Sequence, residues 1–357
     1  MIWSAQVSRM RPLKFERNST EMSAGTESSE SRKSRRIVIT GATGTLGRHV
    51  LAECSELPDT QVLALLRSGS QVGIETTGVQ YERVDFFDKE AIIRALEAFQ
   101  PTAFIHCAAT GMQLPRPSWE EMIRFNVDAS VRLCESSARI AGCHFVFVST
   151  GLAYRDQGRP LREEDPLDSQ IPYAASKAAA DILVRATAAS LGIPLTVVRP
   201  FSFSGAGDAG SRLFPSLLRA AEERRPLDLS PGDQIRDHCA VQDIANGIVL
   251  AAMNRARLSS HIEVLNLGSG STISLRKFIE DLVKDLGLKV KLNFGARDYL
   301  QSEPKYLVAD ISRAGRCLNW QPRTNFPYAI WELARESFPS LRLKEPPEAQ
   351  PHSSWIL

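Results

Sequence analysis

From residue 36 onward, short apolar runs alternate with longer helical segments, and this alternation constrains the fold more than any other feature of the chain. A parallel strand that helices cover on both faces reads as a nearly continuous run of Val, Ile and Leu. The alternation therefore predicts an α/β fold with a doubly wound parallel sheet. The predicted strands are 37–40, 62–66, 79–84, 103–107, 145–149 and 195–199, and the predicted helices between them lie near 46–57, 89–99, 118–141 and 174–191.

After the sixth strand the pattern becomes less regular and predicts a smaller C-terminal α/β lobe over residues 201–335. The first domain, 35–200, is expected to use parts of 235–266 as well. Residues 1–34 are too poor in apolar side chains to fold and are expected to form a disordered tail. Residues 336–357 are Pro-rich and are expected to form a loose second tail. In the lobe, helices are predicted near 212–223, 241–254 and 274–286, and strands at 227–229 and 262–266.

The charge pattern argues against nucleic acid as a partner. The formal net charge is +2 at pH 7, and basic and acidic residues are interspersed along the chain. The basic cluster at 32–36 could act as a nucleic-acid arm, but a solvated tail before a first strand is the commoner arrangement.

The spacing of the cysteines and the lengths of the apolar segments indicate the cellular compartment of the protein. The six cysteines show no CxxC and no metal-like spacing, which indicates buried thiols in a reducing compartment and no metal site. No apolar run approaches the ~20 residues of a membrane helix, and the N-terminus lacks the apolar centre of a signal peptide. We therefore expect a cytoplasmic protein with no membrane partner.

The first predicted strand runs directly into TGATGTLGRHV, which carries glycines at 41, 44 and 47. Glycine allows a tight strand-to-helix turn, and the helix that begins near Thr45 directs free N–H groups and a positive dipole end at an anion. Placed after the first strand of a parallel sheet, this turn predicts a dinucleotide-binding site. The cofactor contacts expected here are Gly41, Thr43, Gly44, Thr45, Leu46, Gly47 and Arg48.

The end of the second strand indicates which dinucleotide binds. Many NAD sites have an acidic residue there, but this chain has Arg67 and Ser68, which suit a 2′-phosphate with help from Arg48. NADP is therefore favoured over NAD, although Arg67 could also be a solvated cation at a strand end. Asp85, after the third strand, could accept from the adenine amino group. Other contacts expected beside the cofactor are Phe86, Cys107, Ala108 and Ala109.

The sequence YAASK places Tyr173 and Lys177 four residues apart in a predicted helix. This spacing puts both side chains on one helix face, close enough for the ammonium to act on the phenol. A tyrosine ionises near pH 10, so it needs such a neighbour to serve as an acid/base near neutrality. The alternative is a surface Tyr and Lys without a chemical role.

Several motifs follow one another along the chain: TGATGTLG (40–47), Asp85, HCAA (106–109), Asn126, STGLAY (149–154), YAASK (173–177), VRP (198–200) and IRDHCAVQDIA (235–245). In this order they resemble the extended short-chain dehydrogenase/reductase family, in particular its NAD(P)-dependent sugar-nucleotide epimerases and reductases. The resemblance covers about residues 36–335. It implies a Rossmann domain followed by a C-terminal substrate lobe.

The resemblance also implies a catalytic set. Tyr173 matches the family's acid/base, and Lys177 matches the lysine that stabilises the phenolate and binds the nicotinamide ribose. The family pattern (S/T)xxxY selects Thr150, with Tyr154 as its marker, and the hydroxyl would bind the reacting substrate oxygen. Ser149, its neighbour, is the alternative, and only one of the two can serve directly because neighbouring side chains of a strand point to opposite faces.

Further residues are assigned by the same resemblance. Arg236 matches the arginine that contacts the diphosphate in UDP-galactose 4-epimerase relatives, and Arg212 and Phe214 are weaker candidates for phosphate or base contacts. Arg199 and Pro200 are expected to end the sixth strand near the nicotinamide. Asn126 is either a bridge to the backbone near the active site or an ordinary helix residue. Thr110, Thr150 and Phe201 complete the expected substrate contacts.

Departures from the family narrow the chemistry. The 4,6-dehydratases carry an Asp-Glu pair after the Thr, where this chain has Gly151 and Leu152, so dehydration is not expected. Enzymes that epimerise C3 and C5 need a further Cys and His, and residues 203–210 contain no His. Cys107 is expected to pack in the core, and His106 to support the cofactor site rather than act as a base.

The remaining chemistry is hydride transfer at one sugar carbon. The leading hypothesis is an NADP-dependent reductase of a nucleotide-linked 4-keto-6-deoxyhexose, which Arg67 favours because epimerases mostly use NAD with an acid at that position. The first alternative is an NAD(P)-dependent nucleotide-sugar 4-epimerase, which would use the same residues. The second is an inactive dinucleotide-sensing module. We expect a homodimer, since relatives often pair through the helices near 118–141 and 174–191.

Overall fold

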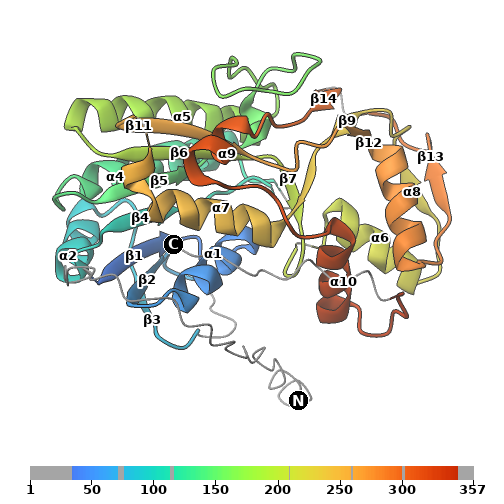
Figure 1. Cartoon of the computed structure of the whole chain (residues 1–357), viewed down its shortest axis with the longest axis horizontal. Helices are drawn as coiled ribbons and strands as arrows, with labels where there is room; N and C mark the ends of the chain where they lie inside the picture. The colour runs from blue at the N-terminus through green and yellow to red at the C-terminus, as the bar shows by residue number, and fades with distance from the viewer. Residues whose placement is uncertain are drawn as a thin grey trace, which may run out of the picture. The chain divides into compact units, whose positions relative to one another are not determined.

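The computed structural model describes residues 34–70, 76–112, 116–208, 210–258, 260–299 and 302–344, and its centre is a seven-stranded parallel sheet (Figure 1). The strand order is β11-β6-β5-β4-β1-β2-β3, and every neighbouring pair is parallel. The strands are β1 (Arg35–Thr40), β2 (Thr60–Leu66), β3 (Val79–Arg83), β4 (Ala103–His106), β5 (His144–Val148), β6 (Leu195–Pro200) and β11 (Ile262–Leu267).

Helices cover both faces of this sheet. On one face α1 (Thr45–Glu56) and α7 (Val241–Met253) pack against it through apolar side chains such as Val50 and Ile248. On the other face lie α2 (Lys89–Phe99), α4 (Ala129–Ser137) and α5 (Pro172–Leu191), packed through a second apolar cluster. This arrangement confirms the predicted Rossmann-type doubly wound fold.

The strand order reverses direction at β1, which lies between β2 and β4. In an open parallel sheet this reversal leaves a crevice at the carboxyl ends of the central strands, where ligands bind. The turns after β1 and β4 both reach this crevice. The sheet topology therefore fixes the place of the site.

The single helix predicted for 118–141 is three consecutive segments. A capping box between Ser118 and Glu121 starts α3 (Trp119–Met122), the chain then forms a π-helical turn, η1 (Ile123–Asp128), and α4 follows. In a π turn the backbone hydrogen bonds span five residues instead of four, and such turns often lie at functional sites. Here it contains the buried Asn126, which bonds to the loop after β4.

The smaller lobe has its own apolar core. Its aromatic centre includes Phe214, Phe278 and Phe326, whose ring centroids lie 5.0–6.0 Å apart. Its larger elements are α6 (Leu213–Glu222), β8 (Leu227–Leu229), α8 (Leu275–Leu286), β13 (Leu292–Phe294) and α10 (Phe326–Ser337). The shorter elements of the described chain as a whole are η2 (Gly151–Ala153), β7 (Ser202–Ser204), β9 (Ile235–Arg236), β10 (His238–Ala240), η3 (Arg255–Arg257), β12 (Ile273–Ser274), β14 (Tyr306–Leu307) and α9 (Ser312–Leu318), of which α9 packs on the core of the large sheet.

The expected C-terminal tail begins later than predicted. Residues 336–344 are ordered by contact with the lobe, because α10 continues to Ser337 and Leu341 and Leu343 pack on the lobe core. The Lys344 N–H also donates to the Leu286 carbonyl at 2.9 Å. The rest of that tail, and residues 1–33 of the N-terminal one, lie outside the described residues. Within the described part of the chain, no helix is long and apolar enough to span a membrane.

Candidate active site

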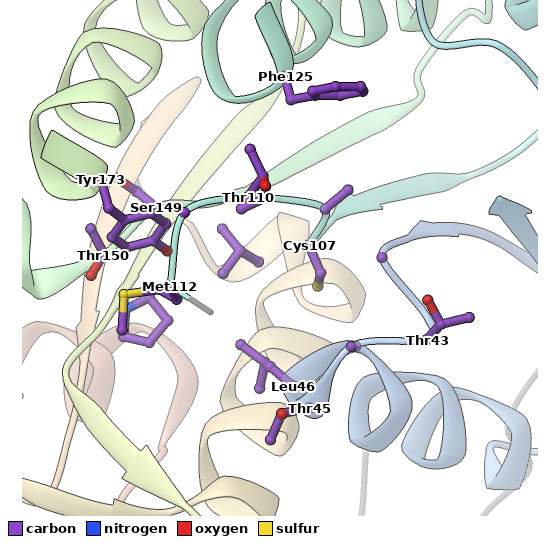
Figure 2. Close-up of a pocket in the computed structure, with 18 of the residues that line it drawn as sticks. Thr43, Thr45, Leu46, Cys107, Thr110, Met112, Phe125, Ser149, Thr150 and Tyr173 are labelled. Atoms are coloured by element: carbon purple, nitrogen blue, oxygen red, sulfur yellow. The ribbon is translucent and has the colours of Figure 1, made fainter. Parts of the chain in front are cut away.

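A cavity of about 510 Å³ opens at the carboxyl ends of β1 and β4, where the topology places a ligand site (Figure 2). It extends from the glycine turn and the end of β2 to the start of α5 and the loop after β6. Most of the residues predicted from the sequence meet here. The predicted residues that line it are Gly41, Thr43, Gly44, Thr45, Leu46, Gly47, Arg67, Phe86, Cys107, Ala108, Ala109, Thr110, Thr150, Tyr173, Pro200, Phe201 and Arg212.

The glycine turn has the geometry of a phosphate cradle. Gly41 has φ +75°, and a Cβ on it would lie 2.6 Å from the Ala108 backbone nitrogen. A Cβ on Gly47 would lie 2.0 Å from the Gly41 carbonyl oxygen, so helix and strand approach closely only because both are glycines. No side chain caps α1, and its first turn carries no acid, which leaves its amide groups and dipole available to an anion. These residues fit a dinucleotide.

Aromatic and cationic side chains form the other end of the cavity. The Arg67 guanidinium lies over the Phe125 ring, 4.8 Å from its centroid, and both residues line the cavity. Next to this pair but outside the cavity lining, the Arg124 guanidinium lies over the Phe87 ring, 4.1 Å from its centroid. Within the described ranges, neither arginine forms an ion pair. Ser68 and Asp85 are exposed and do not line the cavity, and the Asp85 carboxylate accepts instead from the Phe87 N–H.

Tyr173 lies in the first turn of α5, which Pro172 begins, and its ring faces the cavity near Ser149 and Thr150 (Figure 2). Burial raises the pKa of its phenol to about 12, and the Arg212 guanidinium opposes this rise. The expected influence of Lys177 on the phenol is therefore not the main one in this structure. A positive charge bound beside the ring would lower this pKa.

Lys177 is buried, with its Nζ 4.2 Å from the Phe147 ring centroid. No hydrogen-bond partner for this ammonium occurs within the described part of the chain. Burial lowers its pKa to about 7, partly offset by Asp181 and Cys107. A buried ammonium without a partner costs stability, so its presence fits a ligand that accepts from it, such as a ribose hydroxyl.

Both hydroxyl candidates at the end of β5 line the cavity. Thr150 caps η2, and its Oγ1 accepts from the Leu152 N–H at 3.2 Å. The Ser149 Oγ is buried, and among the described residues it has no partner. The Thr150 hydroxyl therefore acts as an acceptor here and retains its proton for donation, and Ser149 stays its alternative.

Two buried side chains support the site from behind. Asn126 accepts from the Thr110 N–H at 2.8 Å and donates to the Thr110 carbonyl and the Ser176 hydroxyl. It therefore bridges the β4 loop to α5 and does not line the cavity. His106 bonds to Thr40 at 2.6 Å, and burial lowers its pKa to about 3, so it is a neutral structural group.

Two predicted cofactor contacts are turned away from the cavity. Arg199 is buried in a two-point ion pair with Asp181, at 2.8 and 3.0 Å, and also donates to the Tyr154 hydroxyl. This corrects the expectation that Arg199 contacts the cofactor, because strand alternation points it to the opposite face from the ligand. Arg48 pairs with Glu336 at 3.0 Å instead of lining the cavity.

Two predicted substrate contacts have other partners in this structure. Arg236 forms an ion pair with Glu303 at 2.8 Å and donates to the Pro304 carbonyl, outside the cavity lining. Phe214 is buried in the aromatic core of the lobe, which corrects its assignment as a substrate contact. Arg212 does line the cavity, with its guanidinium held by Asp208.

A family model described as the NAD dependent epimerase/dehydratase family matches residues 37–268, which is more than half of the chain. The chain belongs to this family. The family predicted from the motif order is therefore confirmed, and the chain is an NAD(P)-dependent oxidoreductase or epimerase of the extended short-chain dehydrogenase/reductase type.

Individual family members show the range of activities. The chain is 29% identical over 250 residues to the UDP-glucuronate 4-epimerase of Thermodesulfobacterium geofontis, covering 68% of this chain and 74% of the relative. It is 29% identical over 321 residues to the dTDP-6-deoxy-L-talose 4-dehydrogenase (NAD(P)(+)) of Kitasatospora kifunensis, covering 84% and 94%. The solved UDP-glucuronic acid 4-epimerase of Bacillus cereus, in complex with UDP-glucuronic acid and NAD, has the same fold, with a TM-score of 0.73 at 22% identity over 84% of this chain and 98% of that one.

Proposed function

We propose that this protein is a nucleotide-sugar 4-epimerase, which inverts C4 of the sugar by removing a hydride and returning it to the other face. The observation that carries this proposal is a single cavity that joins a phosphate-binding glycine turn to Tyr173 and Thr150, with the unpaired ammonium of Lys177 buried beside it. The sequence favoured a reductase, but UDP-sugar 4-epimerases among the relatives favour this alternative.

Each side chain has a role in this chemistry. A nicotinamide dinucleotide, with its pyrophosphate at the glycine turn and its ribose hydroxyls on Lys177, supplies a hydride acceptor and donor when bound. Tyr173 takes the proton of the C4 hydroxyl and later returns it, while Thr150 donates a hydrogen bond to the same oxygen. The pKa of Tyr173, about 12 in the free protein, falls when positive charge binds beside it.

The local structure also supports hydride transfer over dehydration. A Cβ on Gly151 would lie 2.7 Å from the Phe201 ring, so an acidic side chain has no room there. Without an acid next to Thr150, the pair of proton transfers at adjacent carbons has no catalyst.

We further propose that the cofactor is NADP. Arg67 takes the place of the acid that would bind an NAD ribose, and its charge is not neutralised by a described carboxylate. The expected result is tighter binding of NADP than of NAD, and loss of that preference in Arg67→Ala, measured by calorimetric titration. Equal affinity for both cofactors in the unaltered protein would contradict the proposal.

Arg67 also favours a second function, reduction of a nucleotide-linked 4-keto-6-deoxyhexose. A reductase consumes NADPH in each turnover, and the Kitasatospora kifunensis 4-dehydrogenase uses NAD(P)+. The two functions separate in one assay. An epimerase inverts C4 without net change in cofactor, whereas a reductase converts one NADPH for each keto-sugar.

The experiment screens UDP- and dTDP-sugars with purified protein and separates C4 epimers by chromatography. We expect inversion of at least one nucleotide sugar, and none in Tyr173→Phe, which keeps the ring but lacks the phenol proton. No inversion of any nucleotide sugar by a folded, cofactor-loaded protein would overturn the epimerase proposal.

We also propose a homodimer in the cytoplasm. Large apolar side chains are exposed on the α3–η1 segment and on α5, including Trp119, Ile123, Ile182 and Leu183, all at 46–53% exposure. Burying these side chains against a second copy would remove apolar surface from water. Light scattering should show a dimer, and Leu183→Glu should shift it to monomer; a monomeric parent protein would contradict the proposal.

A further inference from the structure

Residues 205–208, called the strap below, cross the first turns of α1. The Thr45 hydroxyl donates to the Gly207 carbonyl at 3.0 Å, and the His49 Nε2 lies 2.9 Å from the Ala206 carbonyl. Thr45 is the first residue of the helix whose N-terminus faces the expected pyrophosphate. The strap is therefore attached to the phosphate-binding end of α1.

Glu336, near the end of α10, contacts both the strap and α1. One carboxylate oxygen accepts from the Gly207 N–H at 2.7 Å, and the other accepts from the Arg48 guanidinium at 3.0 Å. A Cβ on Gly207 would lie 2.1 Å from the Arg48 Nη1, so the arginine packs directly on the strap backbone. One carboxylate thus connects three segments that are far apart in the sequence.

The strap adjoins the cavity. Thr45 of α1 lines the cavity. Ser202 and Phe203, which precede the strap in sequence, and Arg212, which follows it, also line the cavity. A dinucleotide whose pyrophosphate lies at the α1 N-terminus would lie beside Thr45, which the strap contacts and which Figure 2 shows at the start of this helix. Residues 205–208 do not themselves line the cavity, so the strap would act on a bound dinucleotide through α1 and the neighbouring cavity residues.

We propose that Glu336 is a positioning residue that holds the strap closed and so retains the bound nicotinamide dinucleotide between turnovers. This inference rests on the proposed epimerase function, in which the same cofactor molecule accepts the hydride and gives it back. Such an enzyme gains from slow cofactor release, whereas a reductase must exchange its cofactor in every cycle. Glu336 acts through Gly207 and Arg48 and does not itself line the cavity.

The expected change in the cofactor release rate depends on how exposed the Arg48 and Glu336 side chains are. The Arg48 and Glu336 side chains are 48% and 39% exposed, so the ion pair alone contributes little. The hydrogen bond from the Gly207 N–H to a carboxylate is charge-assisted and stronger. Together they predict cofactor release about 3- to 10-fold faster when the carboxylate is lost.

The test measures cofactor dissociation and not turnover. Protein loaded with NADH or NADPH is mixed with excess oxidised cofactor, and loss of the bound-nicotinamide fluorescence gives the release rate. Glu336→Gln and Glu336→Ala should release faster than the unaltered protein, with the alanine variant faster. Glu332→Gln is the matched control, because Glu332 lies one turn earlier on α10 and bonds to Gln242, not to the strap. It should release at the parental rate.

A second measurement covers the case of a variant that does not fold. In the unaltered protein, hydrogen exchange of the peptide that contains 205–208 should slow when NADH or NADPH binds. Parental release rates in folded Glu336 variants, or unchanged strap exchange on cofactor binding, would overturn the inference. Failure of the epimerase proposal would show in the sugar screen instead, since strap retention is measured without a sugar.

Discussion

Lys177 provides a quantitative test, because its buried ammonium has no partner among the described residues. Burial lowers its pKa from 10.5 to about 7. Between these two values the unfolded chain binds the proton and the folded chain does not, so stability must rise with pH. From pH 7 to pH 9 this linkage amounts to roughly 2 kcal/mol in the free energy of unfolding.

The perturbation is Lys177→Met, which fills similar volume without a titrating group. The assay is urea unfolding of nucleotide-free protein at pH 7 and pH 9, for the variant and the parent. Other groups act equally in both proteins, including buried thiols such as Cys54, whose raised pKa lowers stability at high pH. The difference between the two proteins therefore isolates Lys177.

We expect the parent to gain roughly 2 kcal/mol more than Lys177→Met between pH 7 and pH 9. Replacement of the exposed Lys284 by Met is the control and should keep the parental pH dependence. An identical pH dependence in Lys177→Met and the parent would mean that burial does not lower the pKa of Lys177, which is the opposite of what we expect.

Three further predictions concern other buried groups. Burial raises the pKa of Glu53 to about 7, so the free energy of unfolding should fall as pH rises from 4.5 to 7. In urea unfolding over that range, the Glu53→Gln variant should lose less of this free energy than the parent, by on the order of 1–3 kcal/mol. The same pH dependence in both proteins would contradict this. Arg199→Met strips the buried Asp181 of its main partner and should cost about 3–5 kcal/mol in the same assay, and a loss below about 1 kcal/mol would be a contrary result. Thr150→Ala should lower kcat about 10²- to 10³-fold and Ser149→Ala much less; the reverse order would assign the reacting contact to Ser149.

The regular elements were predictable because local patterns specify them. The parallel strands follow from continuous apolar runs, and the glycine turn follows from spacing that only a tight strand-to-helix connection needs. The Tyr173 position followed from the motif order. The strands and the glycine turn depend on residues close together in sequence, whereas Tyr173 was selected by its spacing from Lys177 together with the order of motifs along the whole chain.

The arginines show where sequence reasoning fails. Arg199 and Arg236 occupy positions that the family motif marks, yet their charges are taken up by Asp181 and Glu303. Glu303 is 67 residues away from its partner, and no local pattern predicts that pairing. The Arg48–Glu336 pair also joins residues far apart in sequence, so no local pattern predicts it.

Aromatic contacts were missed for a related reason. Phe125 lines the cavity beneath Arg67, but the sequence shows it only as one apolar residue of a helix. The π-helical turn around it shifts the register that a regular helix would have. A single Phe next to Asn126 in FNVDAS was the available signal.

In the proposed reaction, a hydride leaves C4 of a nucleotide sugar in this cavity and returns to the same carbon. The most direct measurement supplies a nucleotide sugar deuterated at C4, without added cofactor, and examines the product by mass spectrometry and NMR. We expect an inverted C4 that still carries its deuterium, with no reduced cofactor in solution. Deuterium lost to water, or found in released reduced cofactor beside a keto-sugar, would contradict this expectation.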